Sequence, residues 1–317
     1  MKLRGIDFGN VLCGSSALGF FGNDFWYEQK LPPEILNQIT LVTKTVTLLG
    51  NKGNMPLRGD STPDGFYPEC IKIHSSEEMM LVAVALSNLG LGYYLGDERW
   101  QNQDKPFMIS LASLGLTPDE RLNEYQIMAN MINLYKDKFS APFGIQINPT
   151  CPTAKNQLTK ISPTDFCNEL MSILHIMSIV EVPLEVKLGL TSTTPALLDK
   201  LNKHPCCDSI CLSNSIPWGS DIIDWEKVWG SEISLLADLR GGGLTGRHLL
   251  EENCRVIKEA REIFKKPISA SGGVLDIEAV DKVHQAGANS IALCSVLTLK
   301  PENVPGIIEY ANSLDWG

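Results

Sequence analysis

The chain has 317 residues, of which 44% are hydrophobic, and it carries a formal net charge of −10. This acidic balance argues against nucleic acid as a partner, since phosphate binding requires clustered lysine and arginine. No apolar run approaches the ~20 residues needed to cross a bilayer. The first residues also lack the apolar core of a signal peptide, so we expect no membrane partner and a cytoplasmic protein whose nine cysteines are reduced.

Short apolar runs alternate with longer helical patterns along the chain. The runs have the length and composition of strands buried on both faces, and they occupy residues 10–17, 41–48, 107–111, 143–147, 184–188, 209–213, 267–271 and 290–294. Amphipathic helical segments lie at residues 118–138, 163–177, 194–203, 249–264 and 277–286. Such alternation predicts parallel pairing of the strands through right-handed crossovers.

Eight strands in about 300 residues predict an α/β fold, a (β/α)₈ TIM barrel, with residues 1–317 forming one domain. The alternative is an open doubly wound sheet, but no G-x-G-x-x-G follows the first strand. Two connections are too long for simple turns: residues 50–103 after the second strand and residues 216–243 after the sixth. Long loops at the carboxyl ends of strands usually cover or complete a site.

The segment Asn148–Thr153 directly follows the fourth strand, and Cys151 lies in it between Pro149 and Pro152. A lone cysteine is more often a buried core thiol than a reactive one. In barrels of this kind, however, the carboxyl ends of the strands carry the chemistry. We therefore treat Cys151 as the leading candidate for a catalytic residue.

Glycine pairs mark candidate anion sites. Gly272 and Gly273 follow the seventh strand and precede a helix, while Cys294 and Ser295 end the eighth strand. Backbone N–H groups at such positions favour phosphate, although a plain turn also explains a glycine pair. The glycine-rich stretch at residues 240–246 is either a flexible loop or a backbone that wraps a flat ligand.

Two lysines lie within apolar strands, and two asparagines follow apolar strands. Lys44 and Lys187 lie inside such strands, where an unpaired ammonium is costly. Each therefore has a carboxylate partner or meets an anionic ligand. Asn148 and Asn214 follow strands and offer both donors and acceptors.

Together these motifs resemble those of the dihydroorotate dehydrogenase family, an FMN-barrel family, over residues 10–297. The motifs occur in the family's order on the expected strands, and they are Thr43–Thr47, Gly53–Arg58, Asn148–Thr153, Val186–Leu188, Asn214-Ser215, Gly242–Gly246, Gly272-Gly273 and Cys294-Ser295. A cysteine at position 151, rather than a serine, is similar to the soluble branch of the family. The resemblance implies FMN as cofactor and oxidation of dihydroorotate to orotate in pyrimidine biosynthesis.

The resemblance also implies a role for each residue. Cys151 would be the general base, taking a proton next to the carbon that gives hydride to flavin N5. Lys187 would stabilise the reduced flavin near its N1–C2 edge. The residues around the rest of the FMN would be Ser16, Lys44, Thr45, Asn148, Ser213, Gly246, Gly272, Gly273, Cys294 and Ser295. Those that bind the substrate would be Lys44, Asn148, Asn214 and Ser215.

Two positions depart from the family pattern. Val82 and Thr153 stand where the family has substrate-binding asparagines, and each lost polar partner should cost ~1–3 kcal/mol of substrate binding. A flavin enzyme with a different, less polar planar substrate is therefore an alternative. Two further alternatives are a flavin-free phosphosugar lyase or isomerase that uses Lys187 as a Schiff-base amine, and a non-catalytic flavin-binding protein.

The sequence leaves the electron acceptor open between fumarate, NAD through a partner subunit, and a quinone. We expect a homodimer from the family analogy. The apolar segment 222–236, with Trp225 and Trp229, could cover a partner surface or pack as a lid on its own barrel.

Overall fold

Seven parallel strands form the main sheet of the computed structural model, which describes residues 1–317 apart from 23, 26–29, 66–67 and 153–160. Each strand is fully buried, as the apolar runs predict. In spatial order the strands are β3 (Val11–Cys13), β13 (Ser290–Leu293), β12 (Ile268–Ser271), β9 (Ser209–Leu212), β8 (Leu184–Leu188), β7 (Phe143–Ile147) and β6 (Phe107–Leu111).

Residues 40–46 fill the remaining place between β3 and β6. Parallel bridges join Thr40 to Leu12 on one side and Val42 and Val46 to β6 on the other. The predicted strand at 41–48 is therefore wrong as a continuous strand, although the segment occupies the eighth position of a barrel. The reason is that the Lys44 amide donates to Gly19 O instead of to a neighbouring strand, which interrupts the pairing.

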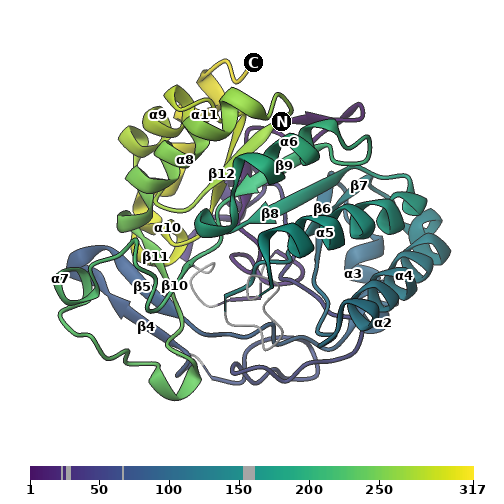
Figure 1. The fold of residues 1–317 in the computed structure, drawn as a ribbon, viewed down its shortest axis with the longest axis horizontal. Helices are drawn as coiled ribbons and strands as arrows, with labels where there is room; N and C mark the ends of the chain where they lie inside the picture. The colour runs from purple at the N-terminus through teal and green to yellow at the C-terminus, as the bar shows by residue number, and fades with distance from the viewer. Residues whose placement is uncertain (23, 26–29, 66–67, 153–160) are drawn as a thin grey trace.

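The outer helices lie where the amphipathic patterns predict them (Figure 1). Thr117 caps the first of them in a reciprocal capping box with Glu120, and Ser162, Thr194 and Asp276 cap three others. The longer helices are α4 (Pro118–Tyr135), α5 (Pro163–Met177), α6 (Pro195–Lys203), α8 (Leu250–Ile263), α9 (Ile277–Gln285) and α11 (Val304–Ser313). The fold predicted from strand–helix alternation is confirmed.

The two long connections meet in a second, antiparallel sheet that we call the roof sheet. Its order is β10 (Ile216–Pro217), β11 (Gly243–Gly246), β5 (Met79–Val82) and β4 (Ile71–His74). In Figure 1 these strands lie together beside the barrel. The glycine-rich stretch thus ends in a strand, because residues 243–246 pair along their whole length with β5.

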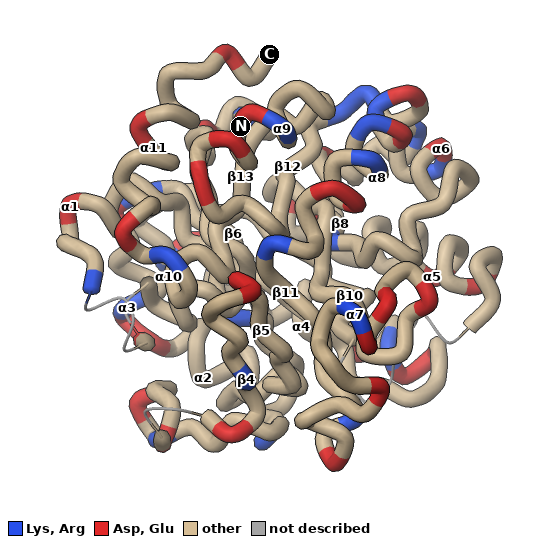
Figure 2. Tube along the Cα trace, turned by 90° about the vertical axis from the view of Figure 1, so that its left-hand side faces the viewer, with Lys and Arg blue, Asp and Glu red and all other residues tan. Residues whose placement is uncertain are grey.

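Short elements complete the described chain. They are β1 (Lys2–Leu3), β2 (Ile6–Asp7), α1 (Pro33–Leu36), α2 (Leu91–Leu95), α3 (Glu98–Gln101), α7 (Trp225–Trp229) and α10 (Val296–Leu299). None of the described helices combines the length and the apolar character needed to span a bilayer. Acidic and basic residues are mixed over the face shown in Figure 2, and on α8 Arg255 pairs with both Glu252 and Glu259.

Candidate active site

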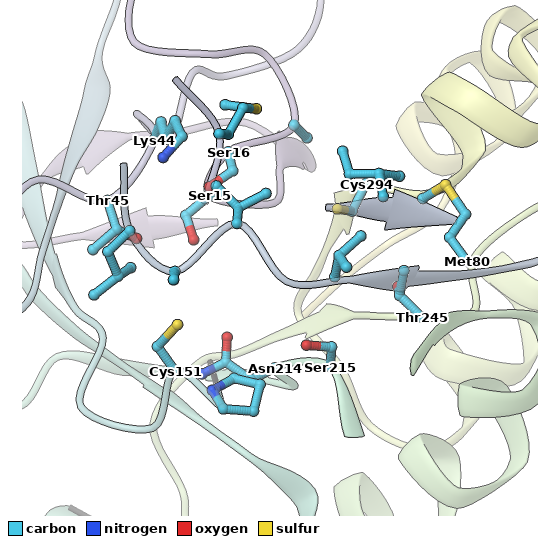
Figure 3. Close-up of a pocket in the computed structure, with 18 of the residues that line it drawn as sticks. Ser15, Ser16, Lys44, Thr45, Met80, Cys151, Asn214, Ser215, Thr245 and Cys294 are labelled. Atoms are coloured by element: carbon cyan, nitrogen blue, oxygen red, sulfur yellow. The ribbon is translucent and has the colours of Figure 1, made fainter. Parts of the chain in front are cut away.

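One cavity lies between the carboxyl ends of the barrel strands and the roof sheet (Figure 3). Cys151, Asn214 and Ser215 gather on one side of it, and Ser15, Ser16, Lys44 and Thr45 lie across from them. The Cys151 sulfur points into the space between the two groups. The barrel position at which chemistry was expected is thus the position of the cavity.

Most of the residues singled out in the sequence line this cavity. They are Ser16, Lys44, Thr45, Asn148, Cys151, Lys187, Ser213, Asn214, Ser215, Gly272 and Cys294. Val82 also lines it. Thr153 lies outside the described residues.

Three predicted phosphate-site residues, Gly246, Gly273 and Ser295, are not among the lining residues. A Cβ on Gly246 would collide with the backbone of Glu78, and a Cβ on Gly273 would lie 2.6 Å from the Leu250 backbone. Ser295 is buried directly before α10. Both glycines therefore permit close packing of neighbouring elements, while their part in cofactor binding stays a prediction.

The two strand lysines are buried beside the cavity. Lys44 Nζ donates to Ser87 O at 2.5 Å and lies 5.3 Å from the centre of the Phe20 ring. Burial lowers the pKa of Lys44 to about 8. Lys187 Nζ donates to Ser15 Oγ at 3.2 Å. Within the described chain neither ammonium takes part in an ion pair, so an anionic ligand is the reading that this part of the structure favours.

Asn148 and Asn214 hold each other in place at the reacting side of the cavity. Asn214 Nδ2 donates to Asn148 Oδ1 at 2.9 Å and to Thr150 Oγ1 at 2.8 Å. These bonds use both amide hydrogens of Asn214, which can therefore offer a ligand only its carbonyl oxygen. Asn148 Nδ2 donates to Thr45 Oγ1 at 3.1 Å and keeps one hydrogen for a ligand.

The cavity also has the groups that a flat, polar cofactor requires. Ser213 Oγ is buried and has no hydrogen-bond partner among the described residues. Gly272 lines the cavity with a φ of 104°, a conformation that favours glycine. Together with Lys187, these groups offer a hydroxyl, an approachable backbone and a positive charge, which fit the polar edge and anionic tail of FMN.

Besides Val82, the roof sheet contributes lining residues that the sequence analysis missed. Ile71 pairs with Val82, and Ile73 pairs with Met80, which in turn faces Thr245 on β11. All five side chains line the cavity, so one face of this sheet forms a largely apolar wall. The two-residue alternation of residues 79–82, with Met79 and Leu81 fully buried, is the signal that could have identified this face.

Comparison with known proteins adds a family and a fold. A sequence model described as "Dihydroorotate dehydrogenase" matches residues 1–311. A curated protein of Thermodesulfovibrio yellowstonii, named dihydroorotate dehydrogenase B (NAD(+)), catalytic subunit, is 26% identical over 312 residues, which cover 98% of this chain and 91% of that protein. A protein of the same name from Thermoanaerobacter sp. (strain X514) is 24% identical over 305 residues, covering 93% and 88%.

Solved structures share the fold at low sequence identity. The dihydroorotate dehydrogenase of Eimeria tenella in complex with ferulenol has a TM-score of 0.68 at 14% identity, covering 98% of this chain and 82% of that one. The ligand-free form of the same enzyme has a TM-score of 0.67 at 13% identity, covering 98% and 86%. These matches support the barrel assignment for this chain.

Proposed function

Since the chain belongs to the dihydroorotate dehydrogenase family, we propose that its cavity binds FMN and oxidises dihydroorotate to orotate, with Cys151 as the base. Enzymes of this family act on a CH–CH bond in pyrimidine biosynthesis. The observation that supports the proposal best is the convergence on one cavity of a strand-end thiol, two asparagine amides and two buried ammonium groups.

Dehydrogenation removes a proton and a hydride from neighbouring carbons of the substrate. Cys151 takes the proton, because its sulfur points into the space between Asn214 and Lys44. FMN, when bound, supplies the acceptor for the hydride. Asn148 and Asn214 orient the ring by hydrogen bonds, and Lys44 supplies positive charge for an anionic substrate group.

Lys187, Ser213 and Gly272, which line the cavity, would hold the FMN. Lys187 would meet its polar edge, Ser213 would supply an unused hydroxyl, and Gly272 would let the backbone come close. The remaining cofactor contacts in the proposal come from Ser16, Lys44, Thr45, Asn148, Gly246, Gly273, Cys294 and Ser295.

Anaerobic titration of the purified protein tests this function. The protein should be yellow and contain FMN, and dihydroorotate should bleach the flavin absorbance in the absence of oxygen. A colourless protein that takes up no FMN on reconstitution would favour a flavin-free barrel. A yellow protein that dihydroorotate never bleaches would rule out this substrate.

A second candidate, oxidation of a less polar planar compound, is favoured by the apolar wall that contains Val82. Val82 pairs with Gly243 on β11. A Cβ added at Gly243 would lie 3.3 Å from the Pro152 side chain, so this wall reaches the reacting side of the cavity. Val82→Asn should leave kcat/KM for dihydroorotate unchanged or lower if dihydroorotate is the natural substrate. A rise in kcat/KM would favour the second candidate.

Two kinds of protein partner belong to the proposal. The relatives named above are called catalytic subunits of an NAD⁺ enzyme, which supports a partner subunit that passes electrons to NAD⁺. A homodimer is supported by the exposed apolar side chains Ile222, Ile233 and Leu235 in the long connection after β9.

A further inference from the structure

We propose that a buried chain of hydrogen bonds, beginning at Glu185, sets the pattern of donors and acceptors that Asn148 and Asn214 present to the substrate. Glu185, Gln146 and Ser110 are then positioning residues, because they act on the substrate only through other side chains. The inference rests on the proposed function, since it concerns how the same site recognises its ring substrate.

The chain crosses the interior of the barrel from β8 to the cavity. Gln146 Nε2 donates to Glu185 Oε1 at 2.8 Å, and Ser110 Oγ donates to Gln146 Oε1 at 3.3 Å. Ser110 Oγ lies 2.9 Å from Thr45 Oγ1, which accepts from Asn148 Nδ2 at 3.1 Å. Every one of these side chains is buried, so water does not offer them alternative partners.

The direction of each bond follows from Glu185. Glu185 Oε1 accepts from Gln146 Nε2, so Gln146 turns its own oxygen toward Ser110. Ser110 then donates to Gln146 and can only accept from Thr45. The Thr45 oxygen is left to accept from Asn148, which turns the carbonyl of Asn148 toward Asn214.

The other end of the hydrogen-bond chain also lies on β8, the strand that carries Glu185. Asn214 Nδ2 also donates to Thr150 Oγ1, whose hydroxyl donates to Lys187 O at 3.2 Å, two residues beyond Glu185 on β8. Because both ends rest on β8, neither asparagine amide can turn over alone. The site therefore offers an acceptor at Asn214 and a donor at Asn148, which suits a ring with neighbouring N–H and C=O groups.

Glu185 would be costly to keep if it served packing alone. It is 1% exposed, and burial raises the pKa of its carboxyl, while hydrogen bonds from Gln146 and Ser209 and the charge of Lys187 act in the opposite direction. An apolar residue at this depth would avoid the desolvation cost. Within the described chain neither Glu185, Gln146 nor Ser110 lines the cavity, so a direct contact with the ligand does not explain the carboxyl.

Ser110→Ala removes the hydroxyl in the middle of the hydrogen-bond chain and leaves the residues that line the cavity unchanged. Ser269→Ala is its matched control: Ser269 is a buried serine on β12 whose Oγ has no hydrogen-bond partner among the described residues. Ser110→Ala should weaken orotate binding, measured by calorimetry, by roughly 10-fold, and should raise KM for dihydroorotate more than it lowers kcat. Ser269→Ala should change neither quantity, and both variants should keep their FMN.

Glu185 provides a second, independent pair of variants. Glu185→Leu removes the acceptor at the start of the chain and should also weaken orotate binding by roughly 10-fold. Glu185→Gln keeps a carbonyl acceptor for Gln146 and should recover most of that loss. If these residues served only the stability of the fold, the variants that leave buried polar groups without partners would have a lower Tm. The orotate Kd of each folded variant would then be unchanged.

Equal orotate Kd values for Ser110→Ala and Ser269→Ala, or no recovery in Glu185→Gln relative to Glu185→Leu, would overturn the inference. The wild-type protein keeps this result separate from the proposed function. If wild type binds orotate and oxidises dihydroorotate while Ser110→Ala behaves like Ser269→Ala, only the positioning chain is wrong. If wild type does neither, the proposed function has failed first.

Discussion

Cys151 and Lys44 face one another across the cavity (Figure 3). Burial is the largest influence on Lys44 and lowers its pKa to about 8, while the charge of a Cys151 thiolate acts in the opposite direction. At the scale of single residues, the site thus pairs a proposed base with a lysine whose own charge is only partly stabilised.

Cys151→Ala should abolish flavin reduction by dihydroorotate while FMN stays bound, because it removes only the proposed base. The rate constant should fall by ~10²–10⁴ in anaerobic stopped-flow experiments. Cys151→Ser should keep weak activity at higher pH. A Cys151→Ala protein that reduces its flavin at the wild-type rate would assign proton removal to another group.

Lys44→Met should stabilise the flavin-free protein. The pKa of Lys44 is about 8 when folded and 10.5 when unfolded, so between these values the unfolded chain binds a proton that the folded chain lacks. Stability should therefore rise with pH across this window, and the buried charge is costly below it. The substitution should raise the free energy of unfolding at pH 7 by up to ~3 kcal/mol, with a smaller gain as pH approaches 10.5.

Urea denaturation at pH 7 and pH 10.5 measures this difference. Lys258→Met, at an exposed position of α8, is the matched control and should leave the free energy of unfolding nearly unchanged at both values. The same stability at pH 7 in Lys44→Met and wild type would show that the buried ammonium is fully compensated. Turnover of dihydroorotate should fall in Lys44→Met, because the proposed substrate contact is lost.

At the scale of elements, glycines determine how closely helices and the roof sheet approach the barrel. Gly273 has a φ of 83° and lies against the first residue of α8, and Gly246 has a φ of 114° and lies against the backbone before β5. A side chain at position 273 would press on α8 rather than fill the cavity. Loss of FMN from a Gly273 variant should therefore follow from displacement of a helix.

Gly273→Ala should lower the free energy of unfolding by about 2–4 kcal/mol, because a left-handed conformation and a backbone clash act together. Gly219→Ala is the matched control: its φ is 81°, but no atom lies within 4 Å of the added Cβ. The control should lose only ~1 kcal/mol. Urea denaturation and the FMN content of the purified proteins measure both effects. If both variants lost the same free energy of unfolding, α8 would have to shift away from the added methyl group at no energetic cost.

At the scale of the whole molecule, the connection after β9 divides into a packed and an exposed part. The rings of Trp225 and Trp218 lie 4.2 Å apart between centroids and are tilted by 35°, and Trp229 packs edge-on against His74 of the roof sheet. These contacts hold α7 against its own connection and the roof sheet. Ile233 and Leu235, at 74% and 64% exposure, remain available for a partner surface.

Wild-type protein should have twice the chain mass in light scattering at micromolar concentration. Ile233→Glu together with Leu235→Glu should give a monomer, because each places a charge in the proposed interface. Leu134→Glu, at a 78% exposed position on α4, is the control and should leave the dimer intact. A monomeric wild type would refute the homodimer.

Local sequence patterns were sufficient to locate the barrel elements and the residues at strand ends. Seven of the eight apolar runs are strands, and Cys151, Asn148 and Lys187 all reach the cavity because strand position places them there. The length and periodicity of an apolar run depend only on residues that are close in the sequence, so they can be read from the sequence directly. The segment at residues 41–48 departs from its pattern because the backbone N–H of Lys44 donates to the carbonyl of Gly19, in the loop after β3, rather than to a neighbouring strand.

The roof sheet and the polar chain behind Asn148 were decided only by tertiary structure. Residues 79–82 and 243–246 pair across more than half of the chain, and the Glu185 chain joins side chains from several strands. Nothing in a local pattern shows which distant residues will share a sheet or a hydrogen bond. The physical reason is that cross-strand pairing and the direction of buried hydrogen bonds depend on partners that only the folded barrel brings within reach.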